Sequence, residues 1–155
     1  MLRILASKSR DNSRTPMQWD ESEHAGFTQG TPWIDVTRNY RDVNAMTSVE
    51  DKGSVFYFYQ SLIHLRKELP VITDGDYQDL MPDHPSVFAY ARSNGSQTLI
   101  CINNFYEERV EITLPSHYDM TQANGVLGNY KTVEQLSLVQ SSNQSLEPYE
   151  SRVFI

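Results

Sequence analysis

The 155-residue sequence has a single cysteine, few basic side chains and no long apolar run. One cysteine excludes a disulfide within the chain, and Cys101 lies in an apolar, strand-like segment where a buried, unreactive thiol is expected. Lys and Arg number 13 against 20 Asp and Glu, a net charge of −7. This balance argues against nucleic-acid or membrane partners, because both require a basic surface. The apolar residues 1–6 are too few for a membrane span or a signal peptide, so a cytoplasmic protein is expected.

The sequence also offers no pattern for a metal or a cofactor. Its four histidines are widely spaced, and the aspartates between residues 74 and 83 lack the spacing of a calcium-binding loop. No glycine-rich phosphate-binding loop is present. We therefore predict no metal site and no cofactor.

Two regions with different patterns divide the chain, at about residue 70. Residues 54–69 carry apolar side chains at helical spacing, with Ser54 as a possible cap and Pro70 as the terminator. A shorter helix is expected over residues 43–50. The aromatic segment 56–59 lies in the longer helix and is interpreted as core rather than as a ligand site.

The second region reads as short strands separated by turns. Strands are predicted at residues 75–80, 86–92, 97–103, 109–114, 125–130, 136–139 and 151–155, and the polar run 140–145 is read as a loop. Asn94-Gly95 between two of these strands is a strong hairpin signal. Strands this short and this closely spaced predict an antiparallel β-sandwich.

The most informative stretch is KSRDNSRTPMQWD at residues 8–20, followed by AGF at 25–27 and GTPW at 30–33. It has neither helical nor strand periodicity and combines arginines, acids, a proline and a tryptophan, as the rigid loop of a binding site does. Taken by itself, it is equally compatible with an ordinary polar turn.

As a string, this stretch resembles the loop after the last catalytic strands in the α-amylase-type glycoside hydrolases, in the branch of phosphotrehalases, oligo-1,6-glucosidases and dextran glucosidases. The phrases SVFAYAR, LICINNFY and LEPYESRVFI resemble the C-terminal β-sandwich of the same branch. The resemblance implies a mostly β chain. Residues 1–69 would be the last loop and helices of a truncated (β/α)8 barrel, and residues 70–155 the C-terminal sandwich that packs on the missing barrel.

Glycoside cleavage requires two carboxyl groups on either side of the scissile bond. None of the acids here stands in a sequence context like those of the family's catalytic carboxylates, which the resemblance places upstream. A complete barrel typically needs about 250 residues. The sequence therefore predicts no catalytic residue in this chain and no activity for the chain alone.

The candidate substrate-binding residues are Arg10 and Arg14. The family resemblance assigns the first arginine of the motif to the non-reducing glucose, and a guanidinium can bridge adjacent hydroxyls. Structural interpretations stay open: Arg10 can pair with Asp11 or Asp20, and Arg14 can tie the loop to the barrel rim. Trp19 can stack on a sugar or anchor the loop.

Three functional interpretations follow. The first is a fragment of a retaining α-glucoside hydrolase, most like a phosphotrehalase, with an α-glucoside or trehalose-6-phosphate as its small sugar partner; oligo-1,6-glucosidase and dextran glucosidase are alternatives. The second is a free-standing carbohydrate-binding module. The third is a purely structural β-sandwich. Fold type alone does not choose among them, whereas the loop motif favours the first.

Overall fold

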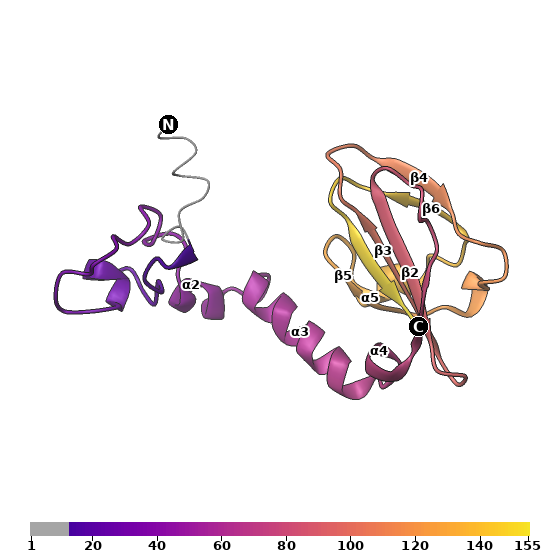
Figure 1. Cartoon of the computed structure of the whole chain (residues 1–155), viewed down its shortest axis with the longest axis horizontal. Helices are drawn as coiled ribbons and strands as arrows, with labels where there is room; N and C mark the ends of the chain where they lie inside the picture. Colours follow the sequence, from indigo (N-terminus) through magenta and orange to yellow (C-terminus); the bar gives the residue numbers. More distant parts are fainter. Residues whose placement is uncertain (1–12) are drawn as a thin grey trace. The chain divides into compact units, whose positions relative to one another are not determined.

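The structure is a computed structural model that describes residues 13–155. The chain forms two compact units, Met1–Tyr59 and Gln60–Ile155. Loops and helices make up the described part of the first, and β-strands dominate the second (Figure 1). None of the helices within residues 13–155 combines the length and the apolar character needed to span a bilayer.

Both predicted helices are present. Helix α2 covers Ala45–Glu50, and helix α3 covers Val55–Glu68. A short 3-10 turn, η2, precedes them at Glu23–Gly26. The chain leaves α3 just before Pro70, as expected for a residue that lacks a backbone N–H. Arg66 and Lys67 occupy the last turn of α3, where positive charge complements the helix dipole.

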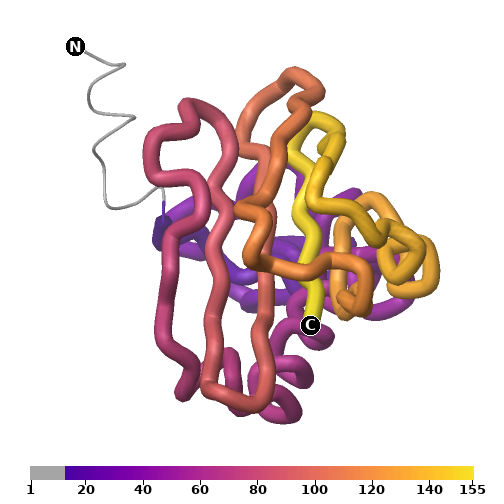
Figure 2. The backbone as a smooth tube through the Cα atoms, turned by 90° about the vertical axis from the view of Figure 1, so that its right-hand side faces the viewer, coloured from indigo at the N-terminus to yellow at the C-terminus, as the bar shows by residue number. Residues whose placement is uncertain are grey.

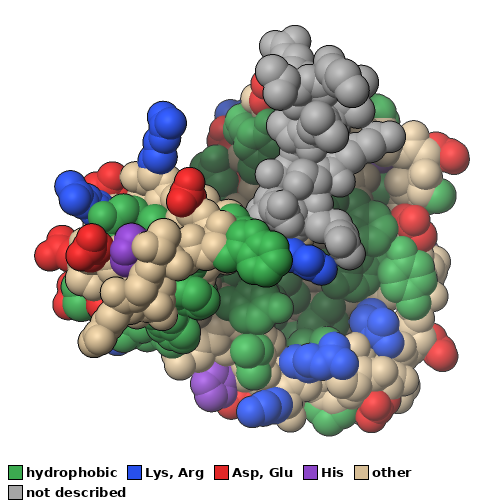
Figure 3. Space-filling view, turned by 60° about the vertical axis from the view of Figure 1, so that its left-hand side comes forward, with side chains coloured by type: hydrophobic (Ala, Val, Ile, Leu, Met, Phe, Trp, Pro, Cys, Tyr) green, Lys and Arg blue, Asp and Glu red, His purple; other side chains and the backbone are tan. Residues whose placement is uncertain are grey.

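The apolar side chains of α3 find no core within the described residues. No residue of α3 is buried, and the side chain of Val55 is 80% exposed. Phe56, Tyr59, Leu62 and Ile63 are exposed as well. Exposed hydrophobic side chains are conspicuous in the space-filling view (Figure 3). A helix that is amphipathic in sequence and unburied in structure points to a packing partner outside the described residues.

The second unit is an antiparallel β-sandwich, which confirms the mostly β fold. One sheet has the order β1-β2-β3-β7-β5 and the other pairs β4 with β6. Figure 2 shows β1, β2, β3 and β7 side by side. The predicted hairpin forms at Asn94 and Gly95, and Gly95 adopts a φ of 84°, a value that favours glycine. The strand bounds are Asp76–Asp79 (β1), Val87–Ser93 (β2), Thr98–Asn104 (β3), Val110–Thr113 (β4), Gly125–Gly128 (β5), Asn143–Leu146 (β6) and Ser151–Phe154 (β7).

Two predictions in the least regular part of the sandwich were wrong. The strand expected at 136–139 is replaced by helix α5, Val133–Ser137, which begins with a capping box between Thr132 and Gln135. The helix seats Leu136 so close to β5 that a Cβ on Gly125 would lie 2.2 Å from the Leu136 Cβ. Strand β6, Asn143–Leu146, lies where a loop was expected at 140–145. One of its two buried residues is Gln144, so the strand lacks the alternation of apolar and polar residues that marks a strand in the sequence.

Besides η2 and α5, two further short helices escaped the sequence analysis. Helix α4, Val71–Asp74, follows Pro70 directly, and the 3-10 turn η3 covers Met120–Gln122. Arg92 of β2 holds α4 in place, since its guanidinium donates to the carbonyl oxygens of Val71 at 3.3 Å, Thr73 at 3.4 Å and Gly75 at 2.6 Å. The local sequence of a four-residue helix cannot predict a contact with a residue about 20 positions away, so α4 was missed.

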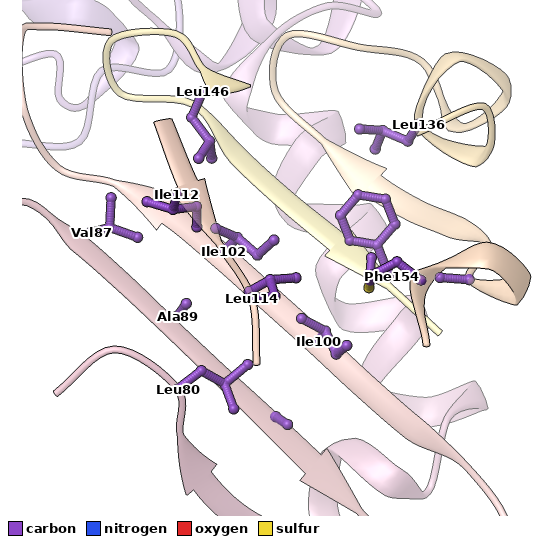
Figure 4. Packing of buried hydrophobic residues seen from close by; sticks show 13 residues of the cluster. Leu80, Val87, Ala89, Ile100, Ile102, Ile112, Leu114, Leu136, Leu146 and Phe154 are labelled. Atoms are coloured by element: carbon purple, nitrogen blue, oxygen red, sulfur yellow. The ribbon is translucent and has the colours of Figure 1, made fainter. Parts of the chain in front are cut away.

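The main core lies between the two sheets. In β2, Val87, Ala89 and Ala91 are buried and alternate with residues of the outer face. Side chains from β2, β3 and β7 meet those of β4 and β6, with Leu136 of α5 and Leu80 joining them (Figure 4). This alternation is the period of two that the sequence predicted.

A buried ionic cluster lies beside this core. Arg152, 2% exposed, donates to both carboxylate oxygens of Glu150 at 2.8 Å and to the Gln144 side-chain oxygen at 2.8 Å. Its guanidinium also donates to the Ser145 carbonyl oxygen, and Lys131 donates to Glu150 at 3.0 Å. The cluster therefore links β7 to β6 and gives the inward-facing Gln144 its partner.

Candidate functional site

The loop singled out by the sequence is fixed to the start of helix α2. The carbonyl oxygens of Gln18 and Trp19 accept hydrogen bonds from the N–H groups of Ala45 at 2.8 Å and Met46 at 3.0 Å. The first N–H groups of a helix have no hydrogen-bond partner within the helix, and those of Ala45 and Met46 are two of them. The end of the loop at Gln18 and Trp19 thus completes the helix, and the helix holds these two residues in place.

Two side chains complete this anchor. Asn44, 3% exposed, caps α2 by accepting from the Thr47 N–H at 2.9 Å, and it donates to the Tyr40 carbonyl oxygen at 2.9 Å. The Gln18 amide donates to the Val43 carbonyl oxygen and accepts from the Thr37 hydroxyl. The sequence analysis missed Asn44 as the cap because it expected the helix to begin at residue 43, whereas α2 begins at Ala45 and the asparagine directly before it is a recognised cap residue.

A tight turn follows the loop. The carboxylate of Asp20 accepts from the Ser22 N–H at 2.8 Å and from the Ser22 hydroxyl at 2.5 Å, and these bonds lower the pKa of Asp20. His24, Ala25 and Gly26 all have φ between 54° and 66°. A Cβ on Gly26 would lie 2.6 Å from an Asp20 carboxylate oxygen, so the AGF segment needs its glycine for both space and conformation.

The structure describes only some of the predicted site residues. Arg10 lies outside the described residues. Arg14 is exposed and makes no hydrogen bond or ion pair with any residue between 13 and 155. Trp19 has its side chain 52% exposed, so its backbone and not its ring anchors the loop. Trp33 of the GTPW segment is also exposed.

One depression beside the loop is largely apolar. A depression of about 470 Å³ is lined by Pro16, Met17, Val43, Val55 and Phe56, with polar neighbours but no ionisable side chain. Within residues 13–155, no group of three or more His, Cys, Asp or Glu is arranged to hold a metal ion. The depression is therefore suited to packing and does not contain the acid and base that a glycosidase needs.

The loop, the helices and the sandwich occur together in one class of enzymes. Residues 1–75 match the family model described as the α-amylase catalytic domain, and residues 77–153 match the maltogenic amylase C-terminal domain. The chain belongs to the α-amylase family of glycoside hydrolases.

Within this family, similar proteins fall into the predicted branch. Trehalose-6-phosphate hydrolase of Bacillus subtilis (strain 168) is 46% identical over 153 residues, which are 97% of this chain and 26% of that protein. Oligo-1,6-glucosidase of Halalkalibacterium halodurans is 40% identical over 155 residues, 100% of this chain and 27% of that protein. The chain thus spans about a quarter of the length of these relatives.

Solved structures agree with this placement. The crystal structure of Bacillus licheniformis trehalose-6-phosphate hydrolase matches with a TM-score of 0.89 and 42% identity, over 98% of this chain and 27% of that one. A mutant of MutB in complex with the substrate sucrose matches with a TM-score of 0.84 and 35% identity, over 94% of this chain and 26% of that one. The structural neighbours therefore include a sugar-bound enzyme.

Proposed function

We propose that the chain is the C-terminal part of a retaining α-glucoside hydrolase that acts on trehalose-6-phosphate in the cytoplasm. The observation that carries this proposal is the 46% identity to a trehalose-6-phosphate hydrolase, in a chain that contains the KSRDNSRTPMQWD loop. Oligo-1,6-glucosidase or dextran glucosidase activity is the alternative, supported by oligo-1,6-glucosidases at 40 to 43% identity.

In this proposal the two parts of the chain have different tasks. Residues 1–69 contribute a loop of the sugar-binding site, in which Arg10 holds the non-reducing glucose and Arg14 lies close by. Residues 70–155 form a sandwich that supports the catalytic barrel. The acid and the nucleophile of the reaction belong to the part of the enzyme that precedes this chain. The hydrogen bonds that attach Gln18 and Trp19 to α2 support the first task, because orienting a sugar requires a loop whose end is fixed.

The chain alone is expected to hydrolyse neither trehalose-6-phosphate nor an aryl α-glucoside, because the proposal places the paired carboxylates that the reaction requires in another part of the enzyme. The purified 155-residue chain is assayed with both substrates, beside the Bacillus subtilis trehalose-6-phosphate hydrolase as a positive control. Turnover that disappears when a single Asp or Glu of this chain is replaced would contradict the expectation.

The outer face of the five-stranded sheet is suited to contact the rest of the barrel. Tyr77, Phe88 and Tyr90 form an aromatic row on it, with ring centroids 5.6 Å apart for Tyr77 and Tyr90 and 5.4 Å for Phe88 and Tyr90. The side chains of Tyr77 and Phe88 are 54% and 40% exposed.

The aromatic row lies next to a small hydrophobic cluster on the same face of the sheet. Tyr90 belongs to a small cluster around Val71, Leu99 and Cys101, which Leu69 and Ile72 also join. Burial raises the pKa of Tyr90 to about 12, so its phenol stays neutral, and it raises the pKa of Cys101 as well. Residues just after α3 therefore pack on the same face, and the catalytic-domain family match, which extends through residue 75, supports a contact between this face and the barrel.

Replacing Tyr77 and Phe88 by serine is expected to weaken association with the missing barrel about tenfold or more, since buried aromatic anchors carry much of an interface's binding energy. The barrel portion of a related trehalose-6-phosphate hydrolase is mixed with this chain, and the apparent affinity is read from restored hydrolysis. Tyr130→Ser, at an exposed tyrosine elsewhere in the sandwich, is the matched control. Equal affinity of the double variant and the control would exclude this face as the contact.

A further inference from the structure

A second pocket lies in the sandwich itself, where β3 begins and β7 ends. Its volume is about 370 Å³, within the range of pockets that hold small ligands. Ile100 and Phe154 form its apolar side. The remaining wall comes from the segment that joins β4 to β5. The pocket lies wholly within the second unit, and neither the Arg10 loop nor the aromatic row of the sheet takes part in it.

Three polar side chains of this wall have bonding capacity to spare. Asp119 uses only one carboxylate oxygen, Oδ1, which accepts from the Thr121 N–H at 2.9 Å and from the Thr121 hydroxyl at 2.7 Å. Its Oδ2 accepts nothing from residues 13–155. The imidazole of His117 and the side-chain amide of Gln122 likewise make no hydrogen bond there, and both side chains are exposed.

Of the two aromatic rings beside these groups, that of Tyr118 is held in place by a hydrogen bond. The rings of His117 and Tyr118 lie with centroids 4.3 Å apart, and Tyr118 donates from its hydroxyl to the Gln78 side-chain oxygen of β1 at 2.8 Å. The hydrogen bonds from Thr121 lower the pKa of Asp119, so this carboxylate is ionised at neutral pH. The pocket thus presents an anchored tyrosine ring beside an exposed imidazole, one anionic acceptor and one amide.

This set of groups selects a neutral, polyhydroxylated ring. Neither lysine nor arginine lines the pocket, so a phosphate group would meet Asp119 without a compensating cation. A pyranose offers adjacent hydroxyls to the carboxylate and the amide, and an apolar C–H face to the aromatic rings. A pyranose is also small enough for the pocket.

We propose that this pocket is a second carbohydrate-binding site, which takes a neutral glucosyl unit and is separate from the site that Arg10 serves. The proposal goes beyond the hydrolase function and does not depend on it. The site would hold part of a glucoside chain, or a free sugar, on the sandwich and would perform no chemistry.

Titration of the ¹⁵N-labelled 155-residue chain with methyl α-D-glucopyranoside and with isomaltose tests the proposal. Amide shifts are expected at residues 98, 117–122 and 155, with a Kd of about 1 mM, the scale set by ligand efficiency for a ligand of this size. Asp119→Asn keeps an oxygen that can accept from Thr121 but loses the anionic acceptor, and it should bind about tenfold more weakly. His117→Ala should weaken binding comparably.

Glu134→Gln removes another exposed carboxylate from the same unit and should leave the affinity unchanged. Glucose 6-phosphate should give no shifts at these residues. The proposal is overturned by the absence of shifts well above the expected Kd, by shifts confined to other residues, by equal weakening in Asp119→Asn and Glu134→Gln, or by glucose 6-phosphate binding as tightly as glucosides.

Discussion

Replacing Arg152 by alanine is expected to lower the free energy of unfolding of the sandwich by about 3–5 kcal/mol, the cost of leaving a buried charge without its partner. Arg152 is the donor that faces Glu150 and Gln144, and both residues are as buried as it is. Its removal would leave the Glu150 carboxylate with the partly exposed Lys131 and one backbone N–H. Urea unfolding followed by circular dichroism measures the loss.

Arg109→Ala is the matched control for this change. Arg109 forms an ion pair with Glu147 at 3.8 Å on the surface, with its side chain 61% exposed, and such pairs contribute at most about 1 kcal/mol. Arg152→Lys keeps the charge without the planar fork and should give an intermediate loss. Equal effects of Arg152→Ala and Arg109→Ala would show that burial of the cluster does not matter to stability.

The same cluster predicts how stability depends on pH. Burial alone would raise the pKa of Glu150, but hydrogen bonds from Arg152, the Glu147 N–H and Lys131 outweigh it, and the pKa lies below its ordinary value. A depressed folded-state pKa contributes stability above the pKa of an unfolded glutamate. That contribution is lost as the pH falls through the folded value. The Glu150→Gln variant should therefore lose less stability than the wild type when the pH is lowered from neutral into this acidic range.

In an enzyme that joins this chain to a complete barrel, Arg10→Ala is expected to lower kcat/KM by an amount equivalent to about 2–4 kcal/mol. This is the size of effect expected when a charge-assisted hydrogen-bonding partner is lost from a desolvated site. The reason is that a guanidinium fork fixes hydroxyls of the glucose while its ring distorts toward an oxocarbenium-like transition state. Arg10→Lys should recover only part of the loss, since an ammonium group lacks the fork.

The test can use a chimera in which this chain replaces the corresponding quarter of a related trehalose-6-phosphate hydrolase. Steady-state kinetics and melting temperature are measured for each variant side by side. Arg14→Ala removes the same charge from the same loop and should leave the kinetics of the folded enzyme near normal. A lower melting temperature with unchanged kcat/KM for Arg10→Ala would make Arg10 a structural residue and end its assignment to sugar binding.

Local sequence determined much of the fold. Helix α3, helix α2 and six of the seven strands lie where periodicity, Pro70 and Asn94-Gly95 predicted them, because these signals act on neighbouring residues. The family was also readable from the string at residues 8–20. The role of Arg10 rests on that string alone.

Tertiary contacts decided the rest. Gln144 faces inward in β6, where Arg152, eight residues away, donates to its amide oxygen, so no pattern of hydrophobic residues marked this strand. Leu136 occupies a helix because Gly125 of β5 leaves space for it. Gln18 and Trp19 are fixed by N–H groups of Ala45 and Met46 more than 20 residues along the chain. Sequence periodicity records which face of an element is apolar, but pairings between distant polar groups are set by three-dimensional geometry.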